Sequence, residues 1–358
     1  MNMTKITSEW SARFSNMGLL CACMVVMRHI GLVPERGKPV WWTWQLFVSY
    51  DALTMVAVPF FFLASGFFMA GHVGENGWYL REIRKRINSL LIPFVAWNLI
   101  YFAFMIGLDY AAGIVGFHPH IQIPAHATIV DLFNAVGLNP FCSSALDTLW
   151  FLRTLFLFVL VSAFLCRFCR TRILAPLFAL MVFLLSLGMR FLGSDGRRIV
   201  EFTFSLEGLF YFMAGMSLRQ HPITLSRPRQ IGVIALVGGL VTFGMLALLR
   251  YFLADVYLLP YRLVGTLLLM IGLLFLLPGK KVFGVYSDLS FPIYLFHKFI
   301  LVVMAGLASC LGWREIVIRD SLLYFVRLLM VVLLVRATFP VLKRTFPKMV
   351  TLLLGGRS

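Results

Sequence analysis

The sequence predicts an all-α membrane protein that forms one transmembrane domain over residues 1–358 and crosses the bilayer with about ten helices. Its composition supports this fold class, because 60% of the 358 residues are hydrophobic and only 13% are charged. A soluble domain is about half apolar and roughly a quarter charged. Many apolar runs also approach the length of about 20 residues that a helix needs to cross the hydrocarbon core. The strands of a membrane barrel would instead be short and alternate in polarity.

Ten apolar runs are the expected spans. In chain order they lie at 17–33, 48–71, 89–109, 148–165, 173–192, 202–218, 230–250, 260–278, 287–308 and 321–340. The stretch 110–147 between the third and fourth runs contains several glycines and prolines, so we expect it to form an outer loop. No soluble appended domain is expected.

The positions of the basic residues predict the orientation of these spans. The net charge of +17 is concentrated between the apolar runs, which is typical of cytoplasmic connections and of contact with anionic lipid headgroups rather than of nucleic-acid binding. The expected cytoplasmic connections carry Arg81, Arg84, Lys85, Arg86, Arg167, Arg170, Arg172, Arg219, Arg227, Arg229, Lys280 and Lys281, and the C-terminal tail adds Lys343, Arg344, Lys348 and Arg357. The expected outer connections are poorer in basic residues, since the 110–147 segment has no Lys or Arg, although Arg197 and Arg198 fall on the outer side. Both termini are therefore expected in the cytoplasm.

Two histidines lie inside apolar runs. His29 is in the first run beside Arg28, and His297 is in the ninth. An ionisable residue at membrane depth usually faces a protein interior or a wet cavity and serves a function. At about 1.5 Å of rise per residue, both histidines are expected near mid-membrane, where they can share one cavity. There a neutral imidazole can accept a proton from a hydroxyl. A neutral histidine bonded to a neighbouring helix is the structural alternative.

Two further charges are expected at matched depth. Arg153 and Glu207 each lie about five residues into spans that enter from the outer side. One interpretation is a structural ion pair between them, because each charge otherwise lacks a partner. The other interpretation is a place in an acceptor pocket. By contrast, the histidines of the outer loop, His118, His120 and His126, have no clearly placed carboxylate or thiolate beside them, so no metal site is expected.

Five segments, read together, resemble acyltransferase family 3, the bacterial integral-membrane O-acyltransferases. They are MVVMRH at 24–29, VPFFFLASGF at 58–67, RKRINSLLIP at 84–93 followed by Trp97, LWFLR at 149–153, and SDLSFPIYLFH at 287–297. Each segment is weak alone, but they occur in the order of the family and at the matching spans. The resemblance covers nearly the whole chain, although the fifth to eighth spans contribute little beyond hydropathy.

The resemblance implies an acyltransferase of the bacterial cytoplasmic membrane. Its co-substrate would be an acyl-CoA, usually acetyl-CoA, with no permanently bound cofactor. Its acceptor would be a hydroxyl of an envelope glycan or glycolipid. His29 would be the general base, and His297 would orient the thioester or a partner, or stabilise charge on the thioester oxygen. Direct transfer is the expected route, with a covalent acyl-histidine as the alternative. The oligomeric state is not predicted.

The donor and acceptor residues follow from the same comparison, each beside a structural alternative. Arg84, Lys85 and Arg86 suit the phosphates of coenzyme A, but positive-inside anchoring explains them equally well. Ser65 and Gly66 follow an aromatic run. Gly66 either permits close helix packing or makes room for the pantetheine arm.

On the acceptor side, Trp150 either stacks on a sugar or anchors the interface. Arg153 and Glu207 are the other acceptor candidates. One departure from the family is Gly18, eleven residues before His29, where many members have a basic residue. Arg13 is the nearest upstream cation, and Arg28 is the alternative substitute.

A transporter or flippase for a glycan, lipid or organic anion is the alternative function. It also needs polar residues near mid-membrane, although the sequence has no evident inverted repeat or paired broken helices. A glycan polymerase is less favoured, because the 110–147 loop lacks the basic residues that would bind a lipid-linked pyrophosphate.

Overall fold

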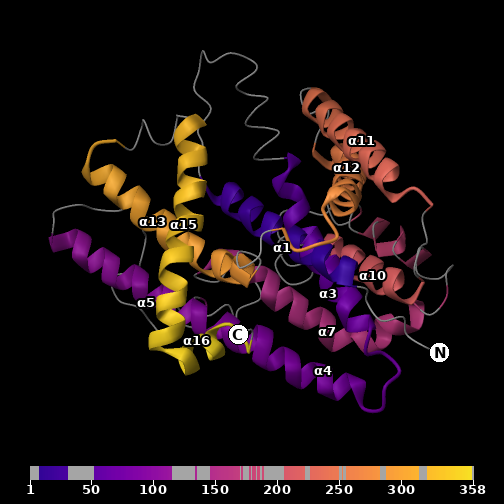
Figure 1. The fold of residues 1–358 in the computed structure, drawn as a ribbon, viewed down its shortest axis with the longest axis horizontal. Helices are drawn as coiled ribbons and strands as arrows, with labels where there is room; N and C mark the ends of the chain where they lie inside the picture. The colour runs from indigo at the N-terminus through magenta and orange to yellow at the C-terminus, as the bar shows by residue number, and fades with distance from the viewer. Residues whose placement is uncertain are drawn as a thin grey trace.

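The computed structural model describes residues 8–30, 52–114, 146–169, 205–221, 226–249, 255–282, 288–313 and 321–356, with isolated positions at 134, 171, 252 and within 177–188. All regular elements in these ranges are helical (Figure 1). They are α1 (Ser8–His29), a 3₁₀ turn (Thr54–Val56), α3 (Ala57–Ala70), α4 (Trp78–Arg86), a π turn (Ile87–Leu91), α5 (Ile92–Ile114), a 3₁₀ turn (Asp147–Leu149), α7 (Trp150–Cys169), α10 (Leu206–Gln220), α11 (Pro228–Leu249), α12 (Asp255–Leu276), α13 (Ser290–Cys310), α15 (Ser321–Thr345) and α16 (Pro347–Leu353). The predicted all-α class is confirmed.

Six of the described helices are long and apolar enough to cross a membrane. They are Ser8–His29, Trp78–Ala111, Asp147–Cys169, Pro228–Leu249, Ser290–Cys310 and Leu322–Thr345, with two shorter apolar helices at Thr54–Ala70 and Pro260–Leu276. The chain is therefore a multi-pass integral membrane protein. The count of ten and the cytoplasmic termini stay predictions. The expected span 173–192 lies mostly outside the described residues.

The boundaries of two helices differ from the expected spans. α1 begins at Ser8 and ends at His29, whereas the apolar run suggested 17–33. Gly31 and Pro34 follow in the sequence, and both residue types commonly stand just beyond a helix end. α5 continues to Ile114, so the first residues of the expected 110–147 loop are helical. Hydropathy identified the apolar part of each helix but not its polar end.

Tertiary hydrogen bonds accommodate the polar start of α1. Asn16 is fully buried, and its side-chain amide donates to the carbonyls of Pro278 and Lys280 at 3.1 and 2.9 Å. Its amide oxygen accepts from the backbone N–H of Val282 at 3.3 Å. These bonds fasten α1 to the segment that follows α12.

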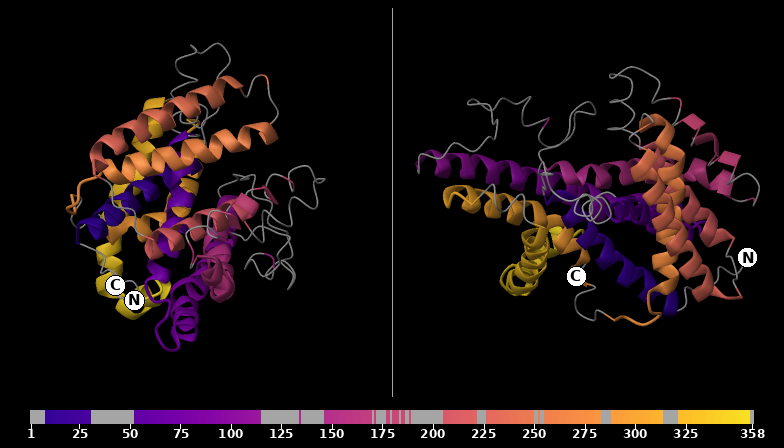
Figure 2. Two further views of the ribbon diagram at one scale, coloured as in Figure 1. Left: turned by 90° about the vertical axis from the view of Figure 1, so that its right-hand side faces the viewer. Right: turned by 90° about the horizontal axis from the view of Figure 1, so that it is seen from above.

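α1 lies in the middle of the described helices and packs on α3, α12, α13 and α15 (Figure 1). α3 in turn packs closely on α10 and α7. Aromatic rings fill the space between these three helices, with ring-centre distances of 5.3 Å for Phe62–Phe158 and 5.5 Å for Phe158–Phe212. α11 and α12 form a tightly packed pair that lies to one side (Figure 2). α3, α7 and α10 therefore share an apolar core with α1.

α4, the π turn and α5 form one helical run from Trp78 to Ile114, and the C-terminal segment docks on it. The indole Nε1 of Trp97 donates to the Leu353 carbonyl of α16 at 2.9 Å. Gly355 has a φ of +65°, and a Cβ there would lie 2.5 Å from the Cα of Ser89 in the π turn. This close approach needs glycine at position 355.

Candidate functional site

The rings of His29 and His297 are in contact, with centres 5.3 Å apart and planes inclined by 42°. His29 is the last residue of α1, and His297 belongs to the third turn of α13. His297 is fully buried, whereas His29 is half-buried. The structure thus brings together the two histidines that the sequence selected from membrane depth.

α15 holds the end of α1 in place. The hydroxyl of Tyr324 donates to the carbonyl of Met27 at 2.9 Å. This carbonyl belongs to the last turn of α1, where backbone acceptors have no partner within the helix. Tyr324 is 1% exposed, so its bond is shielded from water and fixes the turn that carries His29.

A buried tyrosine holds His297 against the start of α7. The Nδ1 of His297 lies 2.7 Å from the carbonyl of Tyr294, one turn earlier in α13. The hydroxyl of Tyr294 donates to the carbonyl of Thr148 at 2.5 Å. The Nε2 of His297 is buried and makes no hydrogen bond with the described residues.

The turn before α7 is bonded to two other helices near the histidines. Lys298 of α13 forms an ion pair with Asp147 at 3.0 Å. The side-chain oxygen of Asn98, a buried residue of α5, accepts from the backbone N–H of Leu146 at 2.9 Å. Sequence reasoning missed Asn98, Asp147, Tyr294 and Lys298, although Tyr294 and Lys298 stand within or next to the 287–297 motif.

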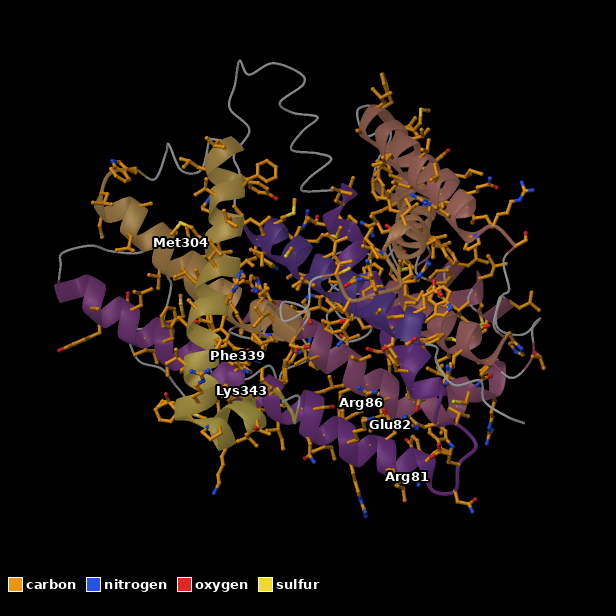
Figure 3. The ribbon with its side chains drawn as sticks, viewed as in Figure 1. Arg81, Glu82, Arg86, Met304, Phe339 and Lys343 are labelled. Carbon is orange, nitrogen blue, oxygen red and sulfur yellow. The ribbon has the colours of Figure 1, made fainter. Side chains whose placement is uncertain are left out.

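The basic cluster of α4 divides into an ion-paired part and an exposed part. Arg86 and Glu82 of the ion-paired part lie next to each other on α4 (Figure 3). The Nε of Arg86 donates to the carboxylate of Glu82 at 2.7 Å, and Glu82 is 3% exposed. Arg84 and Lys85 are exposed. The partly buried guanidinium of Arg86 therefore neutralises a buried carboxylate, while its neighbours face outward.

Gly66 stands where α3 crosses α10. A Cβ at Gly66 would lie 2.0 Å from the carbonyl oxygen of Phe212, and one at Gly215 would lie 2.0 Å from the carbonyl oxygen of Leu63. The two helix backbones touch at these glycines, which is the packing role expected of small residues in membrane helices. Ser65 is half-buried on the adjacent position.

The three acceptor candidates lie on α7 and α10. The ring of Trp150 packs near Phe62 of α3 at a centre distance of 6.2 Å. Arg153 is half-buried on α7. Glu207 forms its described ion pair with Arg262 of α12 at 2.8 Å. Arg262 was not among the sequence candidates, although it is an ionisable residue near the start of an apolar run.

Gly18 and Arg13 lie on α1 far from its histidine end. A Cβ at Gly18 would meet nothing within 4 Å. Arg13 donates to the carbonyls of Leu274 and Phe275 at 3.4 and 3.0 Å and pairs with Glu9 at 2.7 Å. Arg13 therefore holds α1 against the C-terminal end of α12.

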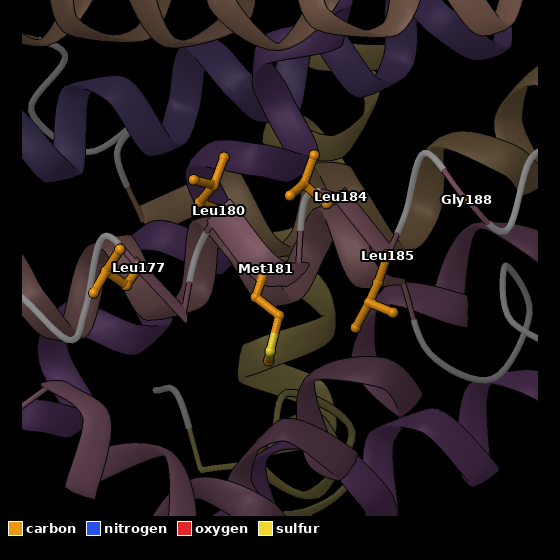
Figure 4. A pocket seen from close by; sticks show the side chains of 6 residues that line it. All are labelled: Leu177, Leu180, Met181, Leu184, Leu185 and Gly188. Carbon is orange, nitrogen blue, oxygen red and sulfur yellow. The ribbon is translucent and has the colours of Figure 1, made fainter.

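Two other features of the chain bear on ligand binding. Among the residues that the structure describes, no group of three His, Cys, Asp or Glu side chains is arranged to hold a metal ion. The histidines His118, His120 and His126 lie outside those residues. An open hollow of about 460 Å³ is lined by Leu177, Leu180, Met181, Leu184, Leu185 and Gly188 (Figure 4). Its apolar lining suits lipid tails better than a polar substrate.

The long apolar helices and the histidine pair place this chain among integral membrane proteins that carry ionisable residues between their helices. A family model described as an acyltransferase domain matches residues 18–354, nearly the whole chain. The chain therefore belongs to this family, acyltransferase family 3. Comparison with curated proteins and with solved structures gives no significant match.

Proposed function

We propose that this protein transfers an acyl group, in particular acetyl, from acyl-CoA to a hydroxyl of an envelope glycan or glycolipid in the bacterial cytoplasmic membrane. Membership of an acyltransferase family supports the reaction class. The observation that carries the proposal is the contact between the His29 and His297 rings, at 5.3 Å, among apolar helices. Imidazole is the side chain best suited to move a proton near neutral pH.

In the proposed reaction His29 is the general base. It accepts the proton of the acceptor hydroxyl while the hydroxyl oxygen attacks the thioester carbon. The new C–O bond forms, the C–S bond breaks, and the thiolate of coenzyme A leaves. His29 then returns the proton to this thiolate, so the enzyme ends in its starting state. His297 orients the thioester or a partner, or stabilises charge on the thioester oxygen.

The donor-binding residues of the proposal lie on α3 and α4. Exposed Arg84 and Lys85 offer cations for the phosphates of coenzyme A. Arg86 supports their helix through its bond to Glu82. Ser65 and Gly66 are the proposed neighbours of the pantetheine arm. Because Gly66 has no side chain, the backbones of α3 and α10 can touch at this position.

On the acceptor side, the proposal places Trp150 against a sugar face. Arg153 and Glu207 would bind its polar groups. Glu207 is suited to this role because its side chain is 28% exposed while paired with Arg262.

The catalytic assignment is tested by His29→Ala and His29→Gln in a strain whose envelope glycans are analysed by mass spectrometry. We expect the acyl modification to disappear while protein levels stay normal. Full acylation with either variant would exclude His29 as the base. Trapping an acylated histidine would instead support the covalent route.

Purified protein in liposomes separates an enzyme from a transporter. We expect release of the coenzyme A thiol when acyl-CoA and a hydroxyl acceptor are supplied. Movement of a glycan or lipid across the bilayer without thioester cleavage would contradict the proposal and support a transporter or flippase.

A further inference from the structure

The hydrogen bond of His297 to its own helix identifies the nitrogen that carries its proton. A backbone carbonyl can only accept, so the Nδ1 that lies 2.7 Å from the Tyr294 carbonyl must be the donor. A neutral imidazole has one N–H. In neutral His297 the Nε2 is therefore the unprotonated nitrogen, which presents a lone pair.

This lone pair points away from the backbone of α13. The Nδ1 edge of the ring is turned toward Tyr294 of the same helix, so Nε2 lies on the other side of the ring. His297 is fully buried, and its Nε2 has no hydrogen-bond partner among the described residues. α1 packs on α13, and its terminal His29 has its ring centre 5.3 Å away. No hydrogen bond joins the two rings in the structure, so the bond proposed below requires the His29 ring to turn one of its nitrogens toward Nε2.

We propose that His297 is a positioning residue that accepts an N–H of His29 at Nε2 and thereby fixes the tautomer of His29. The other ring nitrogen of His29 is then unprotonated and can take the proton of the acceptor hydroxyl. This inference rests on the proposed function and selects one of the roles considered for His297. Neutral His297 has no second N–H for the thioester oxygen, so the charge-stabilising role does not fit its hydrogen bonding.

The proton balance of the transfer is unchanged by this arrangement. The hydroxyl proton moves to the free nitrogen of His29, which becomes an imidazolium with one N–H directed at His297 Nε2. The C–O bond forms, the C–S bond breaks, and the same proton passes to the leaving thiolate. His297 keeps its own proton on Nδ1 throughout. Its role is comparable to that of the carboxylate that orients the histidine in a serine protease triad.

Nitrogen-15 NMR of histidine-labelled protein in nanodiscs tests the tautomer without any need for activity. The His297 signals are assigned by comparison with His297→Gln. We expect a protonated Nδ1 and an unprotonated Nε2 for His297 at neutral pH. A protonated Nε2 with an unprotonated Nδ1 would overturn the inference even if acyl transfer is found.

Kinetics with acyl-CoA test the positioning role. Glutamine at position 297 retains an acceptor, whereas leucine does not. We therefore expect His297→Gln to lower kcat about 10-fold and His297→Leu about 100-fold or more, with donor KM unchanged and an altered pH–rate profile.

His72→Gln is the matched control, because His72 is a partly exposed histidine beside Glu75, in the turn that follows α3. It should behave as wild type. A raised donor KM with unchanged kcat in the His297 variants would assign His297 to donor binding and overturn the positioning role. If wild-type protein transfers no acyl group, the proposed function fails, and the NMR result still decides the tautomer.

Discussion

Tyr324 of α15 donates its hydroxyl to the carbonyl of Met27 at 2.9 Å, two residues before His29. The bond joins a helix near the C-terminus to the last turn of the first helix. Because α1 ends at His29, the catalytic candidate has no further helical turn to hold it. The hydrogen bond from Tyr324 holds this end of α1 from the neighbouring helix α15.

Tyr324→Phe should therefore affect activity more than stability. Loss of one hydrogen bond costs about 1 kcal/mol of stability, but a loosened α1 end should reduce kcat several-fold. Tyr79→Phe is the matched control, because Tyr79 also donates to a backbone carbonyl, that of Leu160, on helices that carry neither histidine. Melting temperature and acyl-CoA turnover are measured for both variants. If Tyr324→Phe and Tyr79→Phe lose kcat equally, the hydrogen bond of Tyr324 has no special role in positioning His29.

Asn16→Leu should release the segment after α12 from α1. The substitution removes three hydrogen bonds that join buried Asn16 to the backbone of Pro278, Lys280 and Val282. We expect a loss of about 1–3 kcal/mol and faster tryptic cleavage at the exposed Lys280 and Lys281. Asn88→Leu, at an exposed position, is the control and should leave the cleavage rate unchanged. Equal resistance of both variants to trypsin would show that Asn16 does not hold this segment.

The two parts of the α4 cluster should respond differently to substitution. Arg86→Gln leaves the Glu82 carboxylate buried without its cation, which should cost roughly 3–5 kcal/mol. The double variant Glu82→Gln with Arg86→Gln should recover much of this loss. Thermal unfolding in detergent measures both effects. A single variant as stable as wild type would mean that the pair is not buried as described.

Charge reversal at the exposed positions tests donor binding. Arg84→Glu combined with Lys85→Glu should raise the donor KM about threefold to tenfold with little change in stability, because exposed charges contribute modestly. Arg229→Glu on α11 reverses an exposed charge elsewhere and serves as control. Identical donor KM values in all three proteins would assign the α4 cluster to membrane anchoring alone.

Two glycine substitutions distinguish close helix packing from open space. Gly66→Ala would place a Cβ 2.0 Å from the Phe212 carbonyl oxygen, which should destabilise the protein by about 1–3 kcal/mol or more because a backbone must move. Gly18→Ala meets nothing within 4 Å and should stabilise α1 by about 1 kcal/mol. Melting temperatures that shift in the opposite order would contradict the described contact of α3 with α10.

Hydropathy identified the helical class and the apolar part of the described helices, because burial in lipid requires long apolar runs. It failed at the start of α1. There Arg13 and Asn16 are polar but are satisfied by carbonyls about 260 residues later in the chain. Such partners are invisible in a local window.

Depth along a helix selected His29 and His297, and their rings are in contact. For Glu207, matched depth suggested Arg153 as a partner, and the structure shows an ion pair with Arg262 that depth did not suggest. Equal depth does not specify which helix faces which. The supporting residues Asn98, Tyr294 and Tyr324 were missed because each bonds to a backbone group, and backbone groups carry no sequence signal.

The central claim is that His29 is the base for acyl transfer from acyl-CoA. Its most direct test is the rate of coenzyme A thiol release by purified protein in nanodiscs, with a hydroxyl acceptor, for wild type and His29→Gln. We predict turnover by wild type and a loss of at least about 100-fold in the variant, with melting temperature and acyl-CoA binding retained. Turnover by His29→Gln at the wild-type rate would contradict the claim.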